Sequence, residues 1–435
     1  MTQHNNVGIL RSMIIILVFA VSAVSTVFPQ DSSIVERCGR LQVKGNKISD
    51  QYGRFVELHG MCLYWSQWKG QFYNESCVQW LVDDWKCTVV RASMGVESGG
   101  YLTNSSTEKA KVTAVIDACV KAGVYVIVDW HDHYAQRHRE NAITFFEEIA
   151  QEYGDTPNLI YEIYNEPWGA VSWKDSVKPY ADSVVKYIRK IDPDNLILVG
   201  SPNWSQDVDV AAQNPVLDTN VAYTLHFYAA THKQTYRNKA AAALSKGAAL
   251  FVSEFGTVTS SGNGTIDSAE TNIWLKFLKD NKISWANWSV ADLAETSAVL
   301  KPGTGVSQFG GWTDDQISIS GHLIRRELRE AYDSTVSITD VKFNSELPTK
   351  FQLEQNYPNP FNPSTSIQYS VASSQMVTLR VYDVIGREIA TLVNEQKQPG
   401  RYEVQWNAAK SVSGVYFYRL QEDGFSQTKR MILIK

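Results

Sequence analysis

The sequence is poor in cysteine, has no excess of positive charge and contains only one long hydrophobic run. Five cysteines occur among 435 residues and none forms a Cys-x-x-Cys pair. This excludes a disulfide-rich scaffold and leaves a zinc or redox site of that kind unsupported. Lys and Arg number 41 against 46 Asp and Glu, a net charge of −5. The chain therefore lacks the basic surface expected of a nucleic-acid-binding protein.

The one strongly apolar run lies at residues 13–21, after Arg11 and before several small residues. It is short for a membrane span and is typical of the hydrophobic region of a secretory signal peptide. We expect a signal peptide over residues 1–30, with an uncleaved N-terminal anchor as the alternative. An exported location permits one or two disulfides among the five cysteines, but the sequence does not reveal their pairing.

What is present is an ordinary globular composition that is rich in aromatic residues. Hydrophobic residues make up 44% of the chain and charged residues 20%, which excludes a disordered or fibrous protein. The length allows two or three domains. Thirteen Trp and 21 Tyr are enough for a surface that stacks flat ligands, although core packing could also use them.

Short apolar runs alternate with amphipathic helical stretches between residues 56 and 290, and a last helix is expected at 321–332. This alternation predicts a parallel sheet covered by helices, and eight runs in this length fit a (β/α)8 TIM barrel of the α/β class. An open doubly wound sheet is the alternative, but no Gly-x-Gly-x-x-Gly opens a helix. The expected strands are 56–58, 88–90, 124–128, 159–163, 196–199, 221–225, 249–252 and 284–287.

The character of the chain changes after Ser334. Residues 353–363 contain three of the 13 prolines and are expected to be extended. Period-two runs at 366–370, 377–382, 402–406 and 415–420, separated by glycines, predict a small immunoglobulin-like β-sandwich. The expected domains are therefore a barrel at 31–337, a linker at 338–352 and a sandwich at 353–435.

Polar side chains follow the predicted barrel strands, at the face where such barrels hold their reacting groups. They are Arg91, His131, Asn165, Glu166, His226, Tyr228, Glu254 and Trp288. Glu166 and Glu254 end the fourth and seventh strands, which brings two carboxyl groups to one narrow barrel mouth. Two carboxyl groups flanking a bond are what glycoside hydrolysis requires.

Each carboxylate also has a simpler interpretation. Asn165-Glu166-Pro167 could be only a helix start, and Glu254 could be a structural partner of Arg91. His131 and His133 could bind a metal, but further ligands on later strands are lacking. The joint placement of these residues at strand ends favours a catalytic site without metal.

Four segments closely resemble glycoside hydrolase family 5, and above all its bacterial cellulases. They are Val-Ile-Val-Asp-Trp-His at 126–131, Leu-Ile-Tyr-Glu-Ile-Tyr-Asn-Glu-Pro at 159–167, Thr-Leu-His-Phe-Tyr at 224–228 and Phe-Val-Ser-Glu-Phe-Gly at 251–256. The resemblance covers about residues 35–335 and implies a retaining endo-β-1,4-glucanase without cofactor. It implies Glu166 as acid/base, Glu254 as nucleophile, and Arg91, His131, Asn165, His226, Tyr228 and Trp288 as supporting residues.

The resemblance also implies a sugar-binding role for Trp68, Trp204, Trp288 and Glu295, with Trp65, Trp168, Trp173 and Trp312 as weaker candidates. Two positions depart from the family pattern. Tyr64 stands where cellulases often have His, and Leu293 replaces a Lys that many relatives use. These departures leave mannan or mixed-linkage glucan open as substrates. A metal-dependent hydrolase and a non-catalytic glycan-binding protein are the alternatives of another class.

The C-terminal module resembles the type A sorting domain of type IX secretion. The resemblance rests on 353–365, on Val-Tyr-Asp-Val-Ile-Gly-Arg at 381–387 and on Gly-Val-Tyr-Phe-Tyr-Arg-Leu at 414–420. It implies the type IX secretion machinery as a partner and a secreted or cell-surface location. A carbohydrate-binding module is the alternative for this sandwich. We expect a monomer whose other partner is a β-glucan, with no nucleic acid bound.

Overall fold

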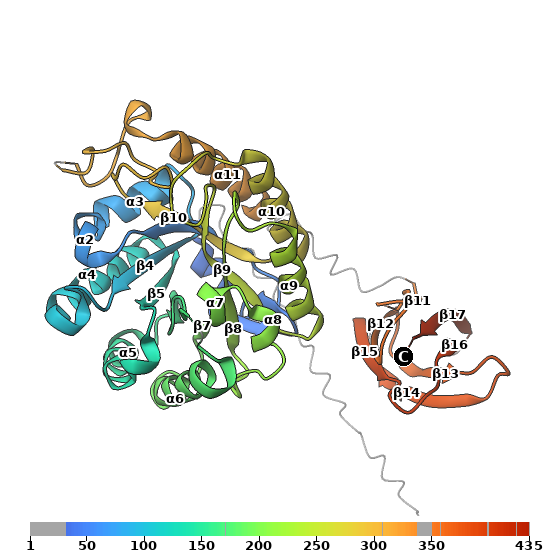
Figure 1. The fold of residues 1–435 in the computed structure, drawn as a ribbon. Helices are drawn as coiled ribbons and strands as arrows, with labels where there is room; N and C mark the ends of the chain where they lie inside the picture. The colour runs from blue at the N-terminus through green and yellow to red at the C-terminus, as the bar shows by residue number, and fades with distance from the viewer. Residues whose placement is uncertain are drawn as a thin grey trace, which may run out of the picture. The chain divides into compact units, whose positions relative to one another are not determined.

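The computed structural model describes residues 32–336 and 350–434, apart from positions 170, 307, 357, 398, 399 and 423. The chain divides into two compact units, residues 1–335 and 336–435. The first is a closed barrel of eight parallel strands in the order β10-β3-β4-β5-β6-β7-β8-β9. Figure 1 looks along this barrel and shows its helices outside the ring of strands. The predicted TIM barrel is confirmed.

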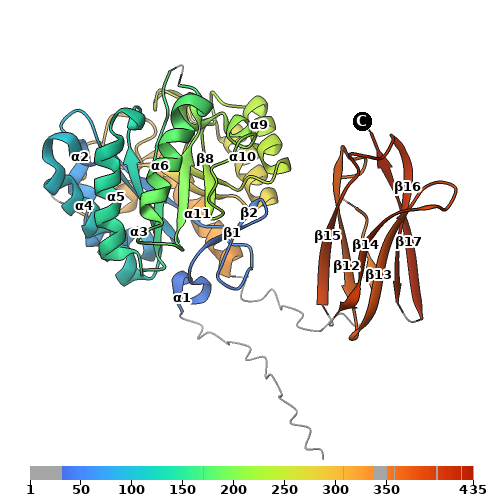
Figure 2. The ribbon, with the colours of Figure 1, turned by 90° about the horizontal axis from the view of Figure 1, so that it is seen from below.

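The barrel strands are buried along almost their whole length because helices cover their outer faces (Figure 2). They are β3 (His59–Leu63), β4 (Val89–Gly95), β5 (Tyr125–His131), β6 (Leu159–Glu162), β7 (Leu196–Gly200), β8 (Val221–Tyr228), β9 (Leu250–Gly256) and β10 (Ser284–Val290). The larger helices around them are α3 (Glu75–Asp83), α4 (Tyr101–Ala122), α5 (Arg139–Tyr153), α6 (Lys178–Ile188), α9 (Gln234–Ser245), α10 (Ser268–Asn281) and α11 (Ile319–Val336).

Shorter elements complete the first unit. Helix α1 (Ile34–Cys38) and the hairpin of β1 (Gln42–Lys44) with β2 (Lys47–Ser49) precede the barrel. The connections between strands and helices carry α2 (Ser66–Lys69), α7 (Pro202–Ser205), α8 (Val208–Ala211) and the single turns η1 (Gly70–Phe72), η2 (Ala135–Arg137), η3 (Trp173–Val177) and η4 (Asp314–Gln316). These connections at the C-terminal ends of the strands build the site.

The first barrel strand was predicted wrongly. The sequence favours 56–58, whereas β3 begins at His59 and continues through Gly60-Met61-Cys62-Leu63. Gly60 weakens the strand pattern, yet the structure needs it, because a Cβ there would lie 1.7 Å from the carbonyl oxygen of Val89 on β4. Most other strands extend one to five residues beyond their predicted C-terminal ends, because polar residues of the site are still hydrogen-bonded to neighbouring strands.

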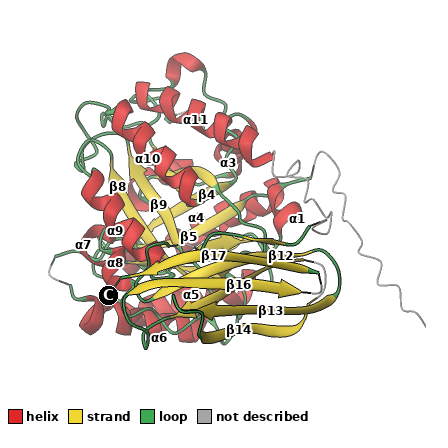
Figure 3. Cartoon of the chain, turned by 90° about the vertical axis from the view of Figure 1, so that its right-hand side faces the viewer, coloured by secondary structure: helices red, strands yellow, loops and turns green. Residues whose placement is uncertain are grey.

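The second unit consists of two antiparallel sheets that share one hydrophobic core, as the predicted sandwich requires. One sheet contains β11 (Gln352–Leu353), β12 (Ser364–Val371) and β15 (Gly400–Asn407), and the other contains β13 (Gln375–Tyr382), β14 (Glu388–Lys397), β16 (Gly414–Glu422) and β17 (Phe425–Leu433). Tyr416 and Tyr418 are buried in this core. The strand β14 was missed because its residues are mostly exposed and polar. Figure 3 distinguishes the all-strand second unit from the mixed first unit.

All five cysteines are buried free thiols. Burial raises the pKa of Cys38 to about 11, and it raises the pKa of the other four thiols further, so all five remain protonated. The expected signal peptide at 1–30 and most of the expected linker at 338–352 lie outside the described residues. Within the described part, no helix is both long and apolar enough to cross a membrane.

Candidate active site

A cavity of about 440 Å³ opens at the C-terminal ends of β6 to β9, the face where the sequence places its candidate residues. Both candidate carboxylates contribute to its wall. The lining residues are Glu166, Asn203, Trp204, Gln206, His226, Tyr228, His232, Tyr236, Glu254 and Ser260. Because a barrel of this kind collects side chains from many strands at one mouth, residues distant in sequence meet here.

Arg91 on β4 lies at the centre of the site and is completely buried. Its guanidinium contacts Glu162 at 2.7 and 3.1 Å, Asp129 at 2.9 Å and Glu254 at 3.0 Å. It also donates a 2.7 Å hydrogen bond to the side-chain oxygen of Asn165. One cation therefore fixes four acceptors from four different elements, which is the geometry that the planar guanidinium favours.

Glu254 projects from β9 and receives two directed contacts. Arg91 holds its Oε2, and the hydroxyl of Tyr228 on β8 donates to its Oε1 at 2.8 Å. Together these contacts fix the orientation of the carboxylate, and both stabilise its ionised form.

Glu166 lies on a short segment after β6 that backbone hydrogen bonds hold on both sides. Its amide donates to the carbonyl oxygen of Asp132 at 3.4 Å, and the amide of Trp168 donates to that of His133 at 3.3 Å. On the other side, Ser205 Oγ donates to the carbonyl oxygen of Asn165 at 2.6 Å. The Asn-Glu-Pro segment is therefore fixed between two loops and does not begin a helix, so that simpler interpretation is wrong.

Two imidazoles face the Glu166 carboxyl group. His226 Nδ1 lies 2.9 Å from Oε1, and His133 Nε2 lies 3.4 Å from Oε2. Behind His226, its Nε2 is 3.0 Å from Ser253 Oγ, which donates to Glu162 at 2.7 Å.

Glu166 and Glu254 lie close together. One oxygen of each, together with a ring nitrogen of His226, are all within 4.8 Å of one another. At this distance the two carboxyl groups interact strongly and titrate as a coupled pair.

Burial, and next the charge of Glu166, raise the pKa of Glu254 to about 7, against the opposing effects of Arg91 and Tyr228. Burial also opposes ionisation of Glu166, but the hydrogen bonds of His133 and His226 outweigh it and lower the pKa of Glu166. This lowering is the effect of imidazoles that donate to Glu166; an imidazole that accepts a proton from Glu166 acts in the opposite direction. The direction in which His226 shifts the pKa of Glu166 therefore depends on which ring nitrogen of His226 carries a proton.

Deeper in the barrel, one cation faces several acids. Burial raises the pKa of Asp129 to about 7 and also raises that of Glu162, with Arg91 opposing both shifts. His131 Nδ1 lies 2.6 Å from Asp129 Oδ2, and burial lowers the pKa of His131 well below its usual value. The ring of His131 therefore stays neutral and stacks parallel to Trp288, with centroids 5.4 Å apart.

The sugar-binding candidates differ in exposure. Trp68 is 53% exposed and Trp204 is 38% exposed, so both can present a ring face to a ligand. Trp288 is only 6% exposed. Of the weaker candidates, Trp173 and Trp312 are buried in the core, whereas Trp65 packs edge-on to His131 at 4.1 Å.

Trp168 joins Trp204 at the rim of the site. It is 44% exposed and its ring centroid lies 6.5 Å from that of Trp204. Asn203, Trp204 and Ser205 all have φ between 55° and 59°, a left-handed conformation that is strained for non-glycine residues. A hydrogen bond from the Trp204 amide to the carbonyl oxygen of Pro167, at 3.1 Å, ties this turn to the Glu166 segment.

The two departures from the family pattern lie on the other side of the site. The hydroxyl of Tyr64 donates to Glu295 Oε1 at 3.3 Å, and its ring lies 5.2 Å from that of Trp288. Lys69 Nζ contacts Asp292, the neighbour of Leu293, at 2.6 Å. Glu295 is therefore held by Tyr64 and remains partly exposed.

Sequence reasoning missed Asp129, Glu162 and Ser253. Glu162 stands inside the predicted strand 159–163, whereas Asp129 and Ser253 directly follow the predicted strands 124–128 and 249–252. The available signal was their placement two residues before His131, four before Glu166 and directly before Glu254. Buried polar residues in apolar strands need partners, and here those partners belong to the site.

Metal binding through the His131 and His133 pair finds no geometric support. Within the described residues, two groups lie close enough to share an ion, namely Glu97 with Asp132 and His138, and Glu166 with His226 and Glu254. Neither contains His131 or His133.

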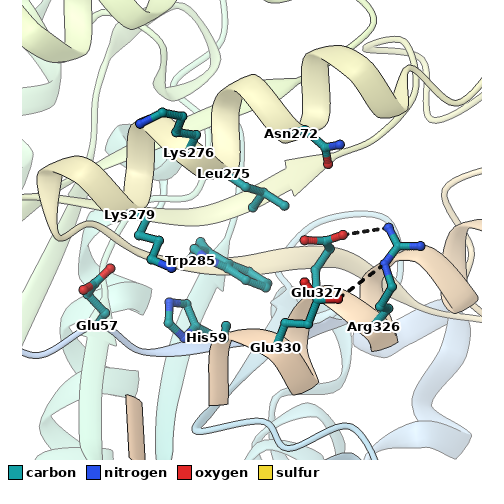
Figure 4. Close-up of a pocket in the computed structure, with 11 residues that line it drawn as sticks. Glu57, His59, Asn272, Leu275, Lys276, Lys279, Trp285, Arg326, Glu327 and Glu330 are labelled. Atoms are coloured by element: carbon teal, nitrogen blue, oxygen red, sulfur yellow. Dashed lines mark hydrogen bonds and ion pairs between the residues drawn. The ribbon is translucent and has the colours of Figure 1, made fainter. Parts of the chain in front are cut away.

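A second cavity, of about 450 Å³, lies at the opposite end of the strands between α10 and α11 (Figure 4). His59 and Trp285, at the N-terminal ends of β3 and β10, form its floor. Lys276, Lys279 and Arg326 face Glu57, Glu327 and Glu330 around it, and Arg326 pairs with Glu327 at 2.7 Å. Its mixed charges and its distance along the strands separate it from the paired carboxylates.

Comparison with known proteins identifies the barrel. Residues 49–293 match the family described as Cellulase (glycosyl hydrolase family 5). The chain belongs to glycoside hydrolase family 5. An endoglucanase of Clostridium saccharobutylicum is 40% identical over 318 residues, which are 72% of this chain and 70% of that protein. Endoglucanase Z of Dickeya dadantii is 50% identical over 268 residues, 60% of this chain and 62% of that protein.

Solved structures of family 5 agree. A protein of Cytophaga hutchinsonii, 51% identical, covers 70% of this chain and 98% of its own with a TM-score of 0.68. The catalytic domain of Thermobifida fusca endoglucanase Cel5A, 36% identical, covers 68% of this chain and 100% of its own with a TM-score of 0.66. A variant of that domain was solved in complex with cellotetraose. The barrel is thus homologous to family 5 endoglucanases.

The second unit has its own match. Residues 355–435 match the family described as Secretion system C-terminal sorting domain. The sandwich is therefore a sorting domain, as its motifs predict, and it directs the chain to secretion or to the cell surface.

Proposed function

We propose that the chain is a secreted endo-β-1,4-glucanase, independent of any cofactor, that hydrolyses internal bonds of cellulose or related β-glucans with retention of configuration. The observation that carries this proposal is the approach of Glu166 and Glu254 to within 4.8 Å. Retaining glycosidases hold their two carboxyl groups about 5–5.5 Å apart, whereas inverting enzymes need about 6.5–9.5 Å to admit a water between them. The approach of one oxygen of Glu166 to one oxygen of Glu254 within 4.8 Å supports the shorter spacing and therefore retention.

The residues then take complementary roles in a double displacement. The Glu254 carboxylate attacks the anomeric carbon while the bond to the leaving oxygen breaks and Glu166 donates its proton to that oxygen. Water next attacks the glycosyl–Glu254 ester, Glu166 accepts its proton, and Glu254 is released as carboxylate. Arg91 and Tyr228 orient the nucleophile, His226 holds the acid/base, and Asn165 is placed to bind the sugar 2-hydroxyl.

A β-1,4-linked glucose chain is the substrate that we propose. The cellotetraose complex of the Thermobifida fusca relative supports this choice. Trp68 and Trp204 offer exposed ring faces for the apolar faces of glucose units. We also assign sugar contacts to Trp288, which stacks on His131, and to Glu295, which accepts from sugar hydroxyls. The acid Glu166 protonates the leaving group, so Trp204 and its neighbour Trp168 belong to the leaving-group side.

Mannan or mixed-linkage glucan is the second candidate substrate, and two positions favour it. Tyr64 and Leu293 replace residues that glucose-specific relatives often use, and Tyr64 contacts Glu295 directly. A changed contact to one sugar hydroxyl alters discrimination between sugars more than it alters the chemistry at Glu254.

We also propose the route of export. A signal peptide within residues 1–30 carries the chain across the inner membrane, and the type IX machinery then recognises the C-terminal sandwich. The match of residues 355–435 to a sorting domain supports the second step.

The stereochemistry of the product tests the proposed reaction. In a proton NMR time course with cellopentaose, we expect the β-anomer of the new reducing end to appear first and the α-anomer only later by mutarotation. An α-anomer formed first would exclude the double displacement. If cellopentaose is not cut, release from mannopentaose under the same conditions would select the second candidate substrate.

The pH dependence of covalent trapping tests the role of Glu254. A fluorinated cellobioside with an activated leaving group needs an ionised nucleophile but no acid. Because the pKa of Glu254 is raised to about 7, the trapping rate should be low at acid pH and rise through that value. A midpoint that stays near 4.5 in the unmodified enzyme would contradict the coupling of the pair.

A further inference from the structure

Two buried residues lie behind His226 and do not line the cavity. Ser253 on β9 and Glu162 on β6 are both fully buried. Ser253 Oγ lies 3.0 Å from His226 Nε2 and 2.7 Å from Glu162 Oε1, and His226 Nδ1 lies 2.9 Å from Glu166 Oε1. Three consecutive hydrogen bonds therefore connect Glu162 to the proposed acid/base.

The direction of these bonds follows from the groups themselves. Arg91 contacts both oxygens of Glu162, so this carboxylate acts as an acceptor only. The single proton of the Ser253 hydroxyl must then point to Glu162, and its oxygen accepts from His226 Nε2. A neutral imidazole that donates through Nε2 has a bare lone pair at Nδ1.

That lone pair faces Glu166. In this tautomer, the 2.9 Å contact between His226 Nδ1 and Glu166 Oε1 is favourable when the Glu166 carboxyl group carries the proton and donates to Nδ1. The reverse tautomer would donate from Nδ1 and stabilise the ionised carboxylate instead. Proton donation from Glu166 to the leaving group requires the tautomer of His226 that donates through Nε2.

We propose that Ser253 and Glu162 are positioning residues that fix the tautomer of His226 and thereby keep Glu166 protonated for transfer to the leaving group. This inference rests on the proposed role of Glu166 as the acid. Neither residue exchanges a proton with the substrate, and both act through His226.

Other charged and titratable groups also face Glu166, and a test must separate them from this chain of contacts. His133 approaches Oε2 from the loop after β5, Glu254 and Tyr228 approach from β9 and β8, and His131, His232 and Arg91 with Asp129 act from farther away. None of them contacts Ser253 Oγ, which bonds only to His226 and Glu162 among the described hydrogen bonds. A change confined to this hydroxyl therefore reports on the tautomer of His226.

The test compares S253A with S253T on two substrates that differ in their need for an acid. Phenyl β-cellobioside has a poor leaving group that needs a proton from Glu166, whereas 2,4-dinitrophenyl β-cellobioside needs none. In S253A, His226 can donate from Nδ1, so the pKa of Glu166 falls. We expect the alkaline limb of kcat/KM for the phenyl substrate to move about one pH unit lower, with about a tenfold loss at neutral pH.

For the dinitrophenyl substrate, S253A should stay within about twofold of the unmodified enzyme, because nucleophilic attack is unaffected. S253T keeps the hydroxyl and should restore the alkaline limb. Equal losses on both substrates, or an unmoved alkaline limb in S253A, would overturn the inference. E166Q on the same pair distinguishes the two proposals: if it slows both substrates equally, the acid role of Glu166 itself is wrong.

Discussion

E254Q should have almost no turnover of cellotetraose, with kcat lower by at least about 10⁴-fold. The amide has nearly the same size and can still accept from Tyr228, but it cannot attack the anomeric carbon. Binding of cellotetraose, measured by isothermal titration calorimetry, should persist because the aromatic surfaces are unchanged. A fluorinated cellobioside should no longer label position 254.

E57Q provides the matched control for this substitution. Glu57 lies in the cavity at the opposite end of the barrel and pairs with Lys282 at 2.8 Å. The same charge change there should leave kcat unaltered. Covalent labelling of a residue other than Glu254 in the unmodified enzyme, identified by peptide mass spectrometry, would show that the nucleophile has been misassigned.

R91M should destabilise the barrel by about 3–5 kcal/mol, because it leaves several buried carboxylates without their cation. Glu162, Asp129 and Glu254 all contact Arg91 within 3.1 Å. Without the cation, the pKa values of these acids rise further above their unfolded values. The deficit should therefore grow as the pH rises above about 7, where Asp129 and Glu254 ionise in the unmodified enzyme, and should shrink at lower pH, where these acids are protonated.

Urea unfolding followed by tryptophan fluorescence measures this effect on the barrel, since 12 of the 13 tryptophans precede residue 337 and only Trp406 follows it. The control is R326M, which removes an exposed guanidinium paired with Glu327 and should change the stability by less than about 1 kcal/mol. If R91M were as stable as R326M, Arg91 would not be the centre of the network.

The architecture could be predicted from the sequence because buried parallel strands appear as continuous apolar runs. The C-terminal ends of the strands could not be predicted, because β8 and β9 continue through polar residues such as His226 and Glu254. The register of neighbouring strands, which pairs these two residues, depends on the closed barrel and not on local pattern. The prediction of the first strand was wrong because Gly60 interrupts the apolar pattern, although the structure needs this glycine for the close approach of β3 to β4.

The residues of the site also differ in whether the sequence alone predicts them. Residues that follow the predicted apolar runs, such as Glu166 and Tyr228, are visible in the sequence as polar interruptions. Ser253 and Glu162 are not, because each is one polar residue within a strand, and their meaning arises only when β6, β8 and β9 lie side by side. Trp168 was underrated because its exposure depends on the left-handed turn at 203–205, which no local pattern announces.

The state of the cysteines has a consequence for where the chain can fold. All five thiols are internal and none is cross-linked, so no disulfide contributes to the stability of the protein. Neither an oxidant nor a disulfide isomerase is required to reach the native state, and no native bond is lost to a reductant. A reducing cytosol and an oxidising exterior are therefore equivalent surroundings for the five thiols, which need no change of redox state when the chain is exported.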